Sequence, residues 1–211
     1  MSTPRLHAED RRRQLLDTAL DIFSRKGFQG TTTKEIAAAA GVTEAIIFRH
    51  FPSKQALYTA VLDYDHDTGQ VSSLFEQWQR FMDANDDVGL FRSILTCVLG
   101  SYRRDSRLKR VLLFAALEGH ETGLAQHRQR SLPIFEPIIQ YVARRQKEGA
   151  IRPGDPAAIV AAVAGMAGYY GMLTGFFGFS TGLSDEQVAE NFLDIILHGV
   201  KPEPPSGKVN E

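Results

Sequence analysis

The residues best suited to do chemistry lie at the starts of two short predicted helices, and their side chains can bind phosphates and base edges. Thr43 and Lys54 stand at helix N-termini, where a hydroxyl, backbone amides and a positive charge suit a phosphate. Glu44, Ala45 and Ile46 follow Thr43 directly. A carboxylate there can accept from cytosine N4, and an apolar side chain can contact a thymine methyl group. These residue types suit contact with double-stranded DNA, although Glu44 could instead only favour the helix dipole.

Other basic side chains extend this predicted surface. Arg49 and His50 lie one turn further along and are expected to contact phosphates. The run Arg11–Arg13 would occupy the first turn of a helix capped by Asp10, where the helix dipole disfavours positive charge. A nearby DNA phosphate would offset that cost. The alternative is a solvated arginine run with Glu9 and Asp10 as its neighbours.

The sequence lacks the patterns of the common enzyme and metal sites. It has no G-x-S-x-G, no Walker A motif and no strand followed by G-x-G-x-x-G. Cys97 is the single cysteine, which excludes an internal disulfide and fits a reducing compartment. Glu118, His120, Glu121 and His127 lack the i, i+4 histidine pair of a helical zinc site. We expect polar residues at a helix junction there, with no metal, no cofactor and no enzymatic activity.

Local signals predict that a helix-turn-helix positions the DNA-binding residues. Thr32 and Glu35 have the spacing of a capping box. Gly41 can adopt the left-handed conformation needed between two helices at a steep angle. The small Ala37 lets the helices cross closely, and Ile47 faces back into the pair. This spacing suits a helix-turn-helix, but an ordinary αα-hairpin has it too.

The rest of the chain is also predicted to be helical, because apolar residues recur at i, i+3 and i+4 while strand-like alternation is absent. Thr43 and Ser53 are expected N-caps, and Pro133 and Pro137 should break or kink the stretch 121–148. The predicted helices cover residues 10–26, 34–40, 44–51, 53–65, 71–84, 88–104, 106–119, 121–148, 156–177 and 184–199. The fold class is therefore all-α, with about nine or ten helices.

The segment 27–58 resembles the DNA-binding domain of the TetR family of bacterial repressors. The family pattern is present as Phe28, Thr31-Thr32, Ile36-Ala37, Ala40-Gly41-Val42-Thr43, Phe48, His50-Phe51 and Ser53-Lys54. The resemblance implies a helix-turn-helix domain over 1–52 and a helical effector-binding and dimerisation domain over 53–200. Beyond them, the tail 201–211 is Pro-rich and polar, and we expect it to be disordered. The residues expected at DNA are Arg11, Arg12, Arg13, Thr33, Thr43, Glu44, Ala45, Ile46, Phe48, Arg49, His50 and Lys54.

Two positions depart from the family pattern. Phe48 stands where the family usually has Tyr, so a hydroxyl contact to a phosphate would be missing. Ala45 stands where Gly is frequent and adds a methyl group facing the groove. Because of these two changes, the operator preference of family members cannot be transferred to this chain residue by residue.

Charge is distributed unevenly along the chain. The net charge is −1, but residues up to Tyr58 carry nine basic and six acidic side chains and are +3, whereas the remainder is −4. Such an asymmetry favours a basic interaction module at the N-terminus. The first thirteen residues have no apolar core of a secretory signal, so we expect a cytoplasmic protein.

A stretch of twenty-nine residues without formal charge lies between Asp155 and Asp185. It is long enough to span a membrane, but it is rich in Gly and Ala and has no flanking Lys/Arg cluster. A helix that is apolar all round can instead be buried on all sides. The resemblance implies that the last two helices form a four-helix bundle with a second copy. We therefore expect a homodimer through Pro156–Phe177 and Ser184–Gly199. Close approach would be helped by Gly165, Gly168, Gly171, Gly175 and Gly178, and by a stripe of Val188, Phe192, Ile195, Ile196 and Gly199.

The resemblance also implies a small-molecule sensor in the second domain. The aromatic candidates for its pocket are Trp78, Phe81, Phe114, Tyr141, Tyr169 and Tyr170, with the kinked region 133–137 nearby. Few charges lie in these stretches, so a largely apolar effector is expected. The predicted function is a repressor released from an inverted-repeat operator by that effector. The alternative is a helical small-molecule-binding protein without operator binding.

Overall fold

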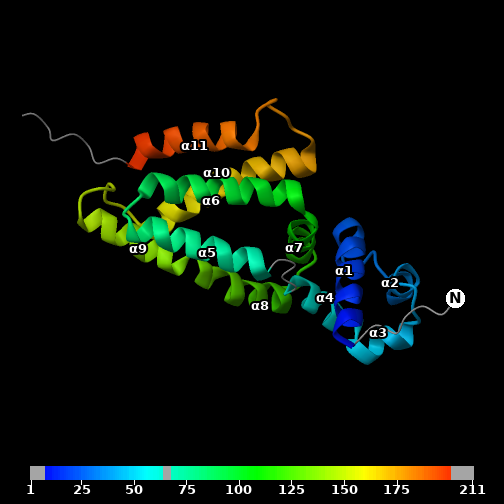
Figure 1. Ribbon diagram of the computed structural model, residues 1–211. Coiled ribbons are helices and arrows are strands. Elements are labelled where there is room, and N and C mark those ends of the chain that lie inside the picture. The colour runs from blue at the N-terminus through cyan, green and yellow to red at the C-terminus, as the bar shows by residue number, and fades with distance from the viewer. Residues whose placement is uncertain (1–7, 64–67, 201–211) are drawn as a thin grey trace, which may run out of the picture. The chain divides into compact units, whose positions relative to one another are not determined.

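The computed structural model describes residues 8–63 and 68–200, and within these ranges it is helical without strands (Figure 1). The all-α prediction is confirmed. The predicted tail 201–211 lies outside the described residues. The helices are α1 (Ala8–Lys26), α2 (Thr33–Ala39), α3 (Glu44–His50), α4 (Lys54–Leu62), α5 (Thr68–Asp83), α6 (Asp87–Arg104), α7 (Arg107–Leu117), α8 (Glu121–Ser131), the 3-10 helix η1 (Leu132–Ile134), α9 (Glu136–Lys147), α10 (Pro156–Phe177) and α11 (Asp185–Val200).

The described residues contain one α-helix more than the ten predicted ranges, because the stretch 121–148 is interrupted at its prolines. α8 ends at Ser131, η1 contains Pro133, and α9 begins at Glu136 with Pro137 in its first turn. Proline lacks an N–H and clashes with the preceding turn in a helix interior, whereas the first turn tolerates it. The expected break is confirmed.

The described residues fall into two compact units, within 1–66 and 106–131 and within 67–105 and 132–211. In the first unit α1 packs on α2, α4 and α7, and α8 packs on α4 and α7. Phe23, Leu57, Tyr58 and Val111 are fully buried in its core. This unit is larger than the segment 1–52 assigned from sequence, because α4, α7 and α8 share the core of the helix-turn-helix.

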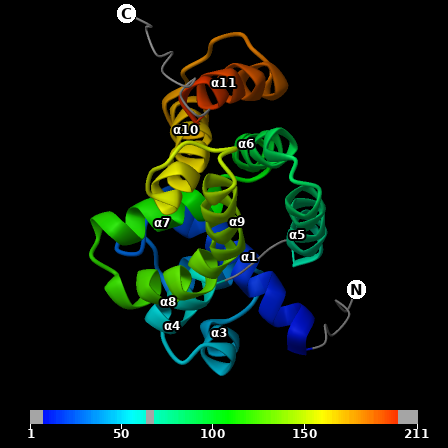
Figure 2. The same ribbon diagram turned by 90° about the vertical axis from the view of Figure 1, so that its left-hand side faces the viewer.

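The second unit is arranged around α6, which contacts α5, α10 and α11. Figure 2 shows α6 between α5 on one side and α10 on the other. Its N-terminus is tied to α9 by Asp87, which accepts hydrogen bonds from Tyr141 Oη and from Arg145 Nε at 3.0 Å. Burial, followed by the Asp87 bond, raises the pKa of Tyr141. Tyr141, expected to line a ligand pocket, is thus engaged in joining α6 to α9.

The glycines of α10 have different surroundings, although sequence suggested one common role for them. A Cβ at Gly171 would lie only 2.4 Å from a ring carbon of Tyr102 on α6, so this glycine serves packing within the chain. Gly165 and Gly168 have nothing within 4 Å of a Cβ. Gly178 ends the helix with a φ of +68°. Close approach of α10 to a second copy therefore remains a proposal only for the open positions Gly165 and Gly168.

The apolar stripe expected on α11 is likewise divided. Val188 and Ile196 are buried in the core of their own unit, together with Leu193. Ile195 is 59% exposed. Assigning the whole stripe to a dimer interface was wrong, because the stripe also faces α6 of the same chain.

Replacing Gly171 by Ala should destabilise the protein, since the added methyl group meets the Tyr102 ring; overpacking of this kind costs about 1–3 kcal/mol. Gly175→Ala is the matched control on the same helix, where a Cβ would meet the Tyr102 ring at an ordinary contact distance of 3.6 Å and helix propensity predicts a gain of about 0.5–1 kcal/mol. Chemical denaturation at one protein concentration measures both. Equal effects of the two substitutions would contradict the observed packing.

Candidate nucleic-acid interface

The helix-turn-helix is formed by the predicted local signals. Thr32 Oγ1 accepts a hydrogen bond from the Glu35 amide at 3.2 Å. Gly41 has a φ of +66°, and the Val42 amide donates to the Ala37 carbonyl at 2.9 Å. Ile47 is fully buried and holds α3 against α2. The turn therefore fixes the angle at which α3 leaves α2.

Two capping interactions differ from expectation. The Glu35 side chain pairs with Lys26 at 2.5 Å, and its predicted return bond to Thr32 is not formed. Thr43 occupies the N-cap position of α3 with extended backbone, but its hydroxyl makes no capping hydrogen bond. Ser53 does cap α4, accepting from the Ala56 amide at 3.0 Å. The Thr43 hydroxyl is exposed at the start of α3.

α1 begins at Ala8 instead of after Asp10, so the expectation that Arg11–Arg13 occupy its first turn was wrong. Glu9 and Asp10 occupy the first turn, where negative charge is favourable, and the arginines lie in the next turn. The dipole therefore gives no reason for a phosphate beside them. The roles of the three arginines follow instead from their side-chain contacts.

The three arginines have different environments. Arg12 Nη1 is 3.5 Å from the His50 carbonyl oxygen, and its guanidinium lies 4.4 Å from the centre of the Phe51 ring. Arg11 donates to Gln14, and Gln14 donates to the Ala40 carbonyl at 3.2 Å. Arg12 and Gln14 thus hold the C-terminal ends of α3 and α2 against α1.

Arg13 is exposed on the next position of α1. Its charge is therefore available to a ligand in solvent.

α3 presents a mixed surface. Ala45, Phe48 and Arg49 are exposed, with 46% of Phe48 accessible, while Ile46 is half-buried. Glu44 accepts a hydrogen bond from Thr33 Oγ1 at 2.5 Å, so it links α3 to α2. The exposed face of α3 is accordingly more apolar than the sequence suggested.

The end of α3 is strongly cationic. The pKa of His50 is lowered, first by burial and then by the positive charges of Arg49, Arg12 and Arg11. Three arginines from α1 and α3 therefore lie close enough to His50 for their positive charges to act on it. Such a concentration of positive potential attracts a polyanion.

Lys54 packs against the turn between α1 and α2. Its ammonium lies 4.2 Å from the centre of the Phe28 ring. Burial lowers the pKa of Lys54, and the charge of Glu118 opposes this shift.

Sequence reasoning missed Gln14 and Glu118 as residues that support this surface. The Glu118 carboxylate accepts from the Phe28 amide at 2.9 Å and from the Gln29 amide at 3.3 Å. These partners are ninety residues apart, so no local signal could identify them. The sequence indicates Glu118 and His120 only as polar residues at a helix junction.

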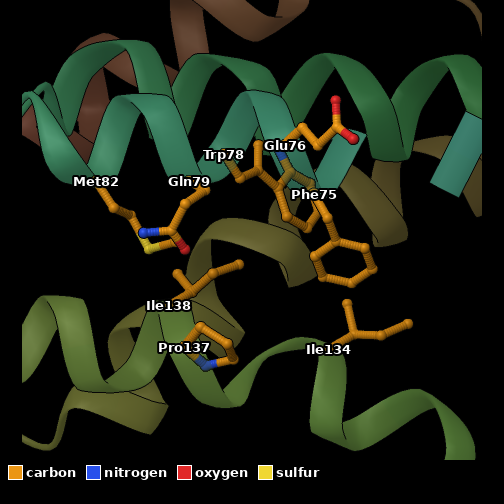
Figure 3. Close-up of a pocket in the computed structure, with 8 residues that line it drawn as sticks. All are labelled: Phe75, Glu76, Trp78, Gln79, Met82, Ile134, Pro137 and Ile138. Carbon is orange, nitrogen blue, oxygen red and sulfur yellow. The ribbon is translucent and has the colours of Figure 1, made fainter. Parts of the chain in front are cut away.

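The second unit contains a cavity of about 260 Å³ between α5 and the η1–α9 region. Its lining is Phe75, Glu76, Trp78, Gln79, Met82, Ile134, Pro137 and Ile138 (Figure 3). Trp78 and the 133–137 region were expected here. Trp78 Nε1 also donates to Ser93 at 3.1 Å, which fixes the indole.

The other aromatic candidates lie elsewhere. Phe81 packs on Gly89, and Phe114 of the first unit faces Gly27. Tyr169 is 61% exposed, and Tyr170 Oη is 2.5 Å from Thr181 Oγ1. The structure does not bring these four to the cavity.

Comparison with known proteins agrees with this geometry. A sequence profile described as "Bacterial regulatory proteins, tetR family" matches residues 15–61. The nucleoid occlusion factor SlmA of Klebsiella pneumoniae is 31% identical over 150 residues, covering 69% of this chain and 71% of that protein. The uncharacterized HTH-type transcriptional regulator YvkB of Bacillus subtilis is 30% identical over 153 residues, covering 69% of this chain and 72% of that protein. AibR, solved in complex with isovaleryl coenzyme A and operator DNA, has a TM-score of 0.62 at 22% identity, covering 88% and 97%.

A phosphate near His50 should make DNA affinity depend on pH. Because the pKa of free His50 is lowered, the ring is neutral at pH 7; a phosphate would raise the pKa, so binding would take up a proton. Affinity for duplex DNA should therefore rise as pH falls from about 8 to about 6, by up to about tenfold per unit of pKa change. His50→Gln should remove this dependence, and His198→Gln on α11 should keep it. Titrations by fluorescence anisotropy measure both, and a dependence retained in His50→Gln would contradict the assignment.

Proposed function

The chain belongs to the TetR family of bacterial regulatory proteins, and we propose that it is a cytoplasmic homodimeric repressor that a small, largely apolar effector releases from an inverted-repeat operator. It is a DNA-binding transcriptional regulator and not an enzyme. The observation that carries the proposal is the exposed face of α3 beside the basic groups of α1.

In the proposed complex, the N-terminal turn of α3 enters the major groove. Ala45 and Phe48 are one turn apart and exposed, so both suit contact with thymine methyl groups, with Ile46 beside them. Glu44 would read cytosine N4 only after releasing Thr33. The phosphate contacts are assigned to Arg11, Arg12, Arg13, Thr33, Thr43, Arg49, His50 and Lys54.

The proposed dimer buries the outer faces of α10 and α11. α10 is long and apolar enough to cross a membrane by length and composition, yet only 22% of its most apolar window is buried within the chain. Ala158, Ala161, Gly165 and Tyr169 are exposed at spacings of three and four residues, so they lie along one side of the helix. Burial against a second copy removes this face from water and leaves small residues where two helices approach. The same burial accounts for Ile195 of α11.

The cavity of the second unit supports a small, largely apolar effector. Six of its lining residues are apolar, and the indole of Trp78 is held in place by Ser93. Its volume of about 260 Å³ suits a compact ligand. Apolar walls with few polar groups select ligands mainly by shape.

Release from DNA is proposed to occur by a population shift. A free dimer would sample the spacing of recognition helices that fits the operator, and the effector would prefer another spacing. An effector that weakens operator binding must itself bind more weakly to the operator-bound dimer, by the same factor.

Salt dependence tests the proposed function. Phosphate contacts release counterions, so log K should fall linearly with log salt by about 0.9 for each contact. The expected result is duplex binding that is tight at low salt and weakens steeply as salt rises. Absence of duplex binding at low salt would support the alternative of a helical small-molecule-binding protein.

A matched pair of substitutions tests the assigned surface. Arg13→Ala should weaken binding to all duplexes uniformly and reduce the salt slope by about 1. Arg152→Ala, which removes an exposed arginine before α10, should leave both quantities unchanged. The same slope in wild type and Arg13→Ala would exclude Arg13 from the interface.

A further inference from the structure

The segment 106–131 belongs to the first unit, although the segments on both sides of it in sequence belong to the second unit. It follows α6 and precedes η1, which both belong to the second unit, but α7 and α8 pack in the first unit on α1 and α4. Both of its ends are therefore covalently joined to the second unit. The residues Glu118–His120, which we name the α7–α8 corner, lie between these two helices.

At this corner one carboxylate binds the turn that leads into the helix-turn-helix. Glu118 Oε2 and Oε1 accept from the Phe28 and Gln29 amides at 2.9 and 3.3 Å, and the Glu118 side chain is only 15% exposed. Hydrogen bonds to an ionised acceptor are stronger than neutral ones. Without Glu118 these two amides would need new partners.

The backbone of the turn lies too close to the corner for any side chain other than hydrogen at Gly27. A Cβ there would be 2.5 Å from Glu118 Oε1 and 2.9 Å from Phe114 Cδ1. Gly27 also has a φ of +67°, a conformation that other residues rarely adopt. A side chain at Gly27 would therefore have to displace the Glu118 carboxylate and the Phe114 ring.

Aromatic contacts hold the same turn from other sides. The Phe28 ring centre is 5.1 Å from that of Tyr58 on α4 and 4.5 Å from that of His120. Tyr58 Oη donates to the Val111 carbonyl of α7 at 3.2 Å. The start of the helix-turn-helix is thereby fixed to α4, α7 and the corner together.

We propose that Glu118 is a positioning residue that transmits displacements of α7 and α8 to the helix-turn-helix through the amides of Phe28 and Gln29. This inference rests on the proposed function, because it explains how the operator-binding spacing of a dimer is set. Glu118 itself contacts no DNA in this account.

The experiment compares Glu118→Gln with Glu121→Gln in the full-length protein. Glu121 is an exposed carboxylate in the first turn of α8, three residues further on. The probes are duplexes in which two copies of a half-site, obtained by selection from random sequence, are separated by different numbers of base pairs. A further duplex carries a single half-site, and the affinity for it is measured as well.

Glu118→Gln should change the spacing profile. Affinity at the spacing preferred by wild type should fall about tenfold, within the usual range of coupling between sites, while affinity for the single half-site stays the same. Amide hydrogen exchange at Phe28 and Gln29 should become faster. Glu121→Gln should match wild type in all three measurements.

Other outcomes overturn the inference. A uniform loss of affinity for every duplex, with a lower melting temperature, would mean that Glu118 only stabilises the fold. An unchanged spacing profile with faster exchange would mean that the contact does not set the spacing. If wild type shows no salt-dependent duplex binding, the proposed function fails first, and Glu118 then has no operator spacing to set.

Discussion

The packing of α7 against α1 and α4 is the constraint on which the rest of the structure depends. Tyr58 and Val111 are fully buried where these helices meet, and Tyr58 donates its hydroxyl proton to the Val111 carbonyl. Burial of a large aromatic side chain gives about 1.5–3 kcal/mol, so this junction contributes much of the stability of a marginally stable domain. Because α7 follows the second unit's α6 in sequence but packs in the first unit, the core of the helix-turn-helix includes residues that are far from it along the chain.

The helix-turn-helix could be predicted because its determinants lie within a few residues of one another. Gly41 allows the turn, Thr32 and Ser53 cap helices, and Ile47 packs back, all through local interactions. The start of α1 was missed by two residues, because Glu9 and Asp10 favour a first turn as well as Asp10 favours a cap. With α1 starting at Ala8, the helix dipole gives no reason for a phosphate beside Arg11–Arg13. The contact of Arg12 with the end of α3 was seen only in the structure.

Long-range contacts account for what the sequence could not predict. The partners of Glu118 are ninety residues away, and the glycine repeat of α10 gave no sign that Gly171 faces Tyr102 of the same chain. The apolar spacing along α11 likewise gave no indication that Val188 and Ile196 are buried in the core of their own unit. Of the aromatic ligand candidates, only Trp78 lines the cavity, since an aromatic side chain in a helix is equally suited to a core, a hydrogen bond or a surface.

The central claim is that two copies of α3 read a two-fold symmetric DNA site. Selection of bound duplexes from random sequence, followed by sequencing and by the mass of the complex with the enriched duplex, tests it most directly. The account predicts an inverted repeat whose half-site centres are about 34 Å or a multiple apart, occupied by an even number of chains. Enrichment of one unrepeated site bound by a single chain, or no enrichment at all, would contradict it.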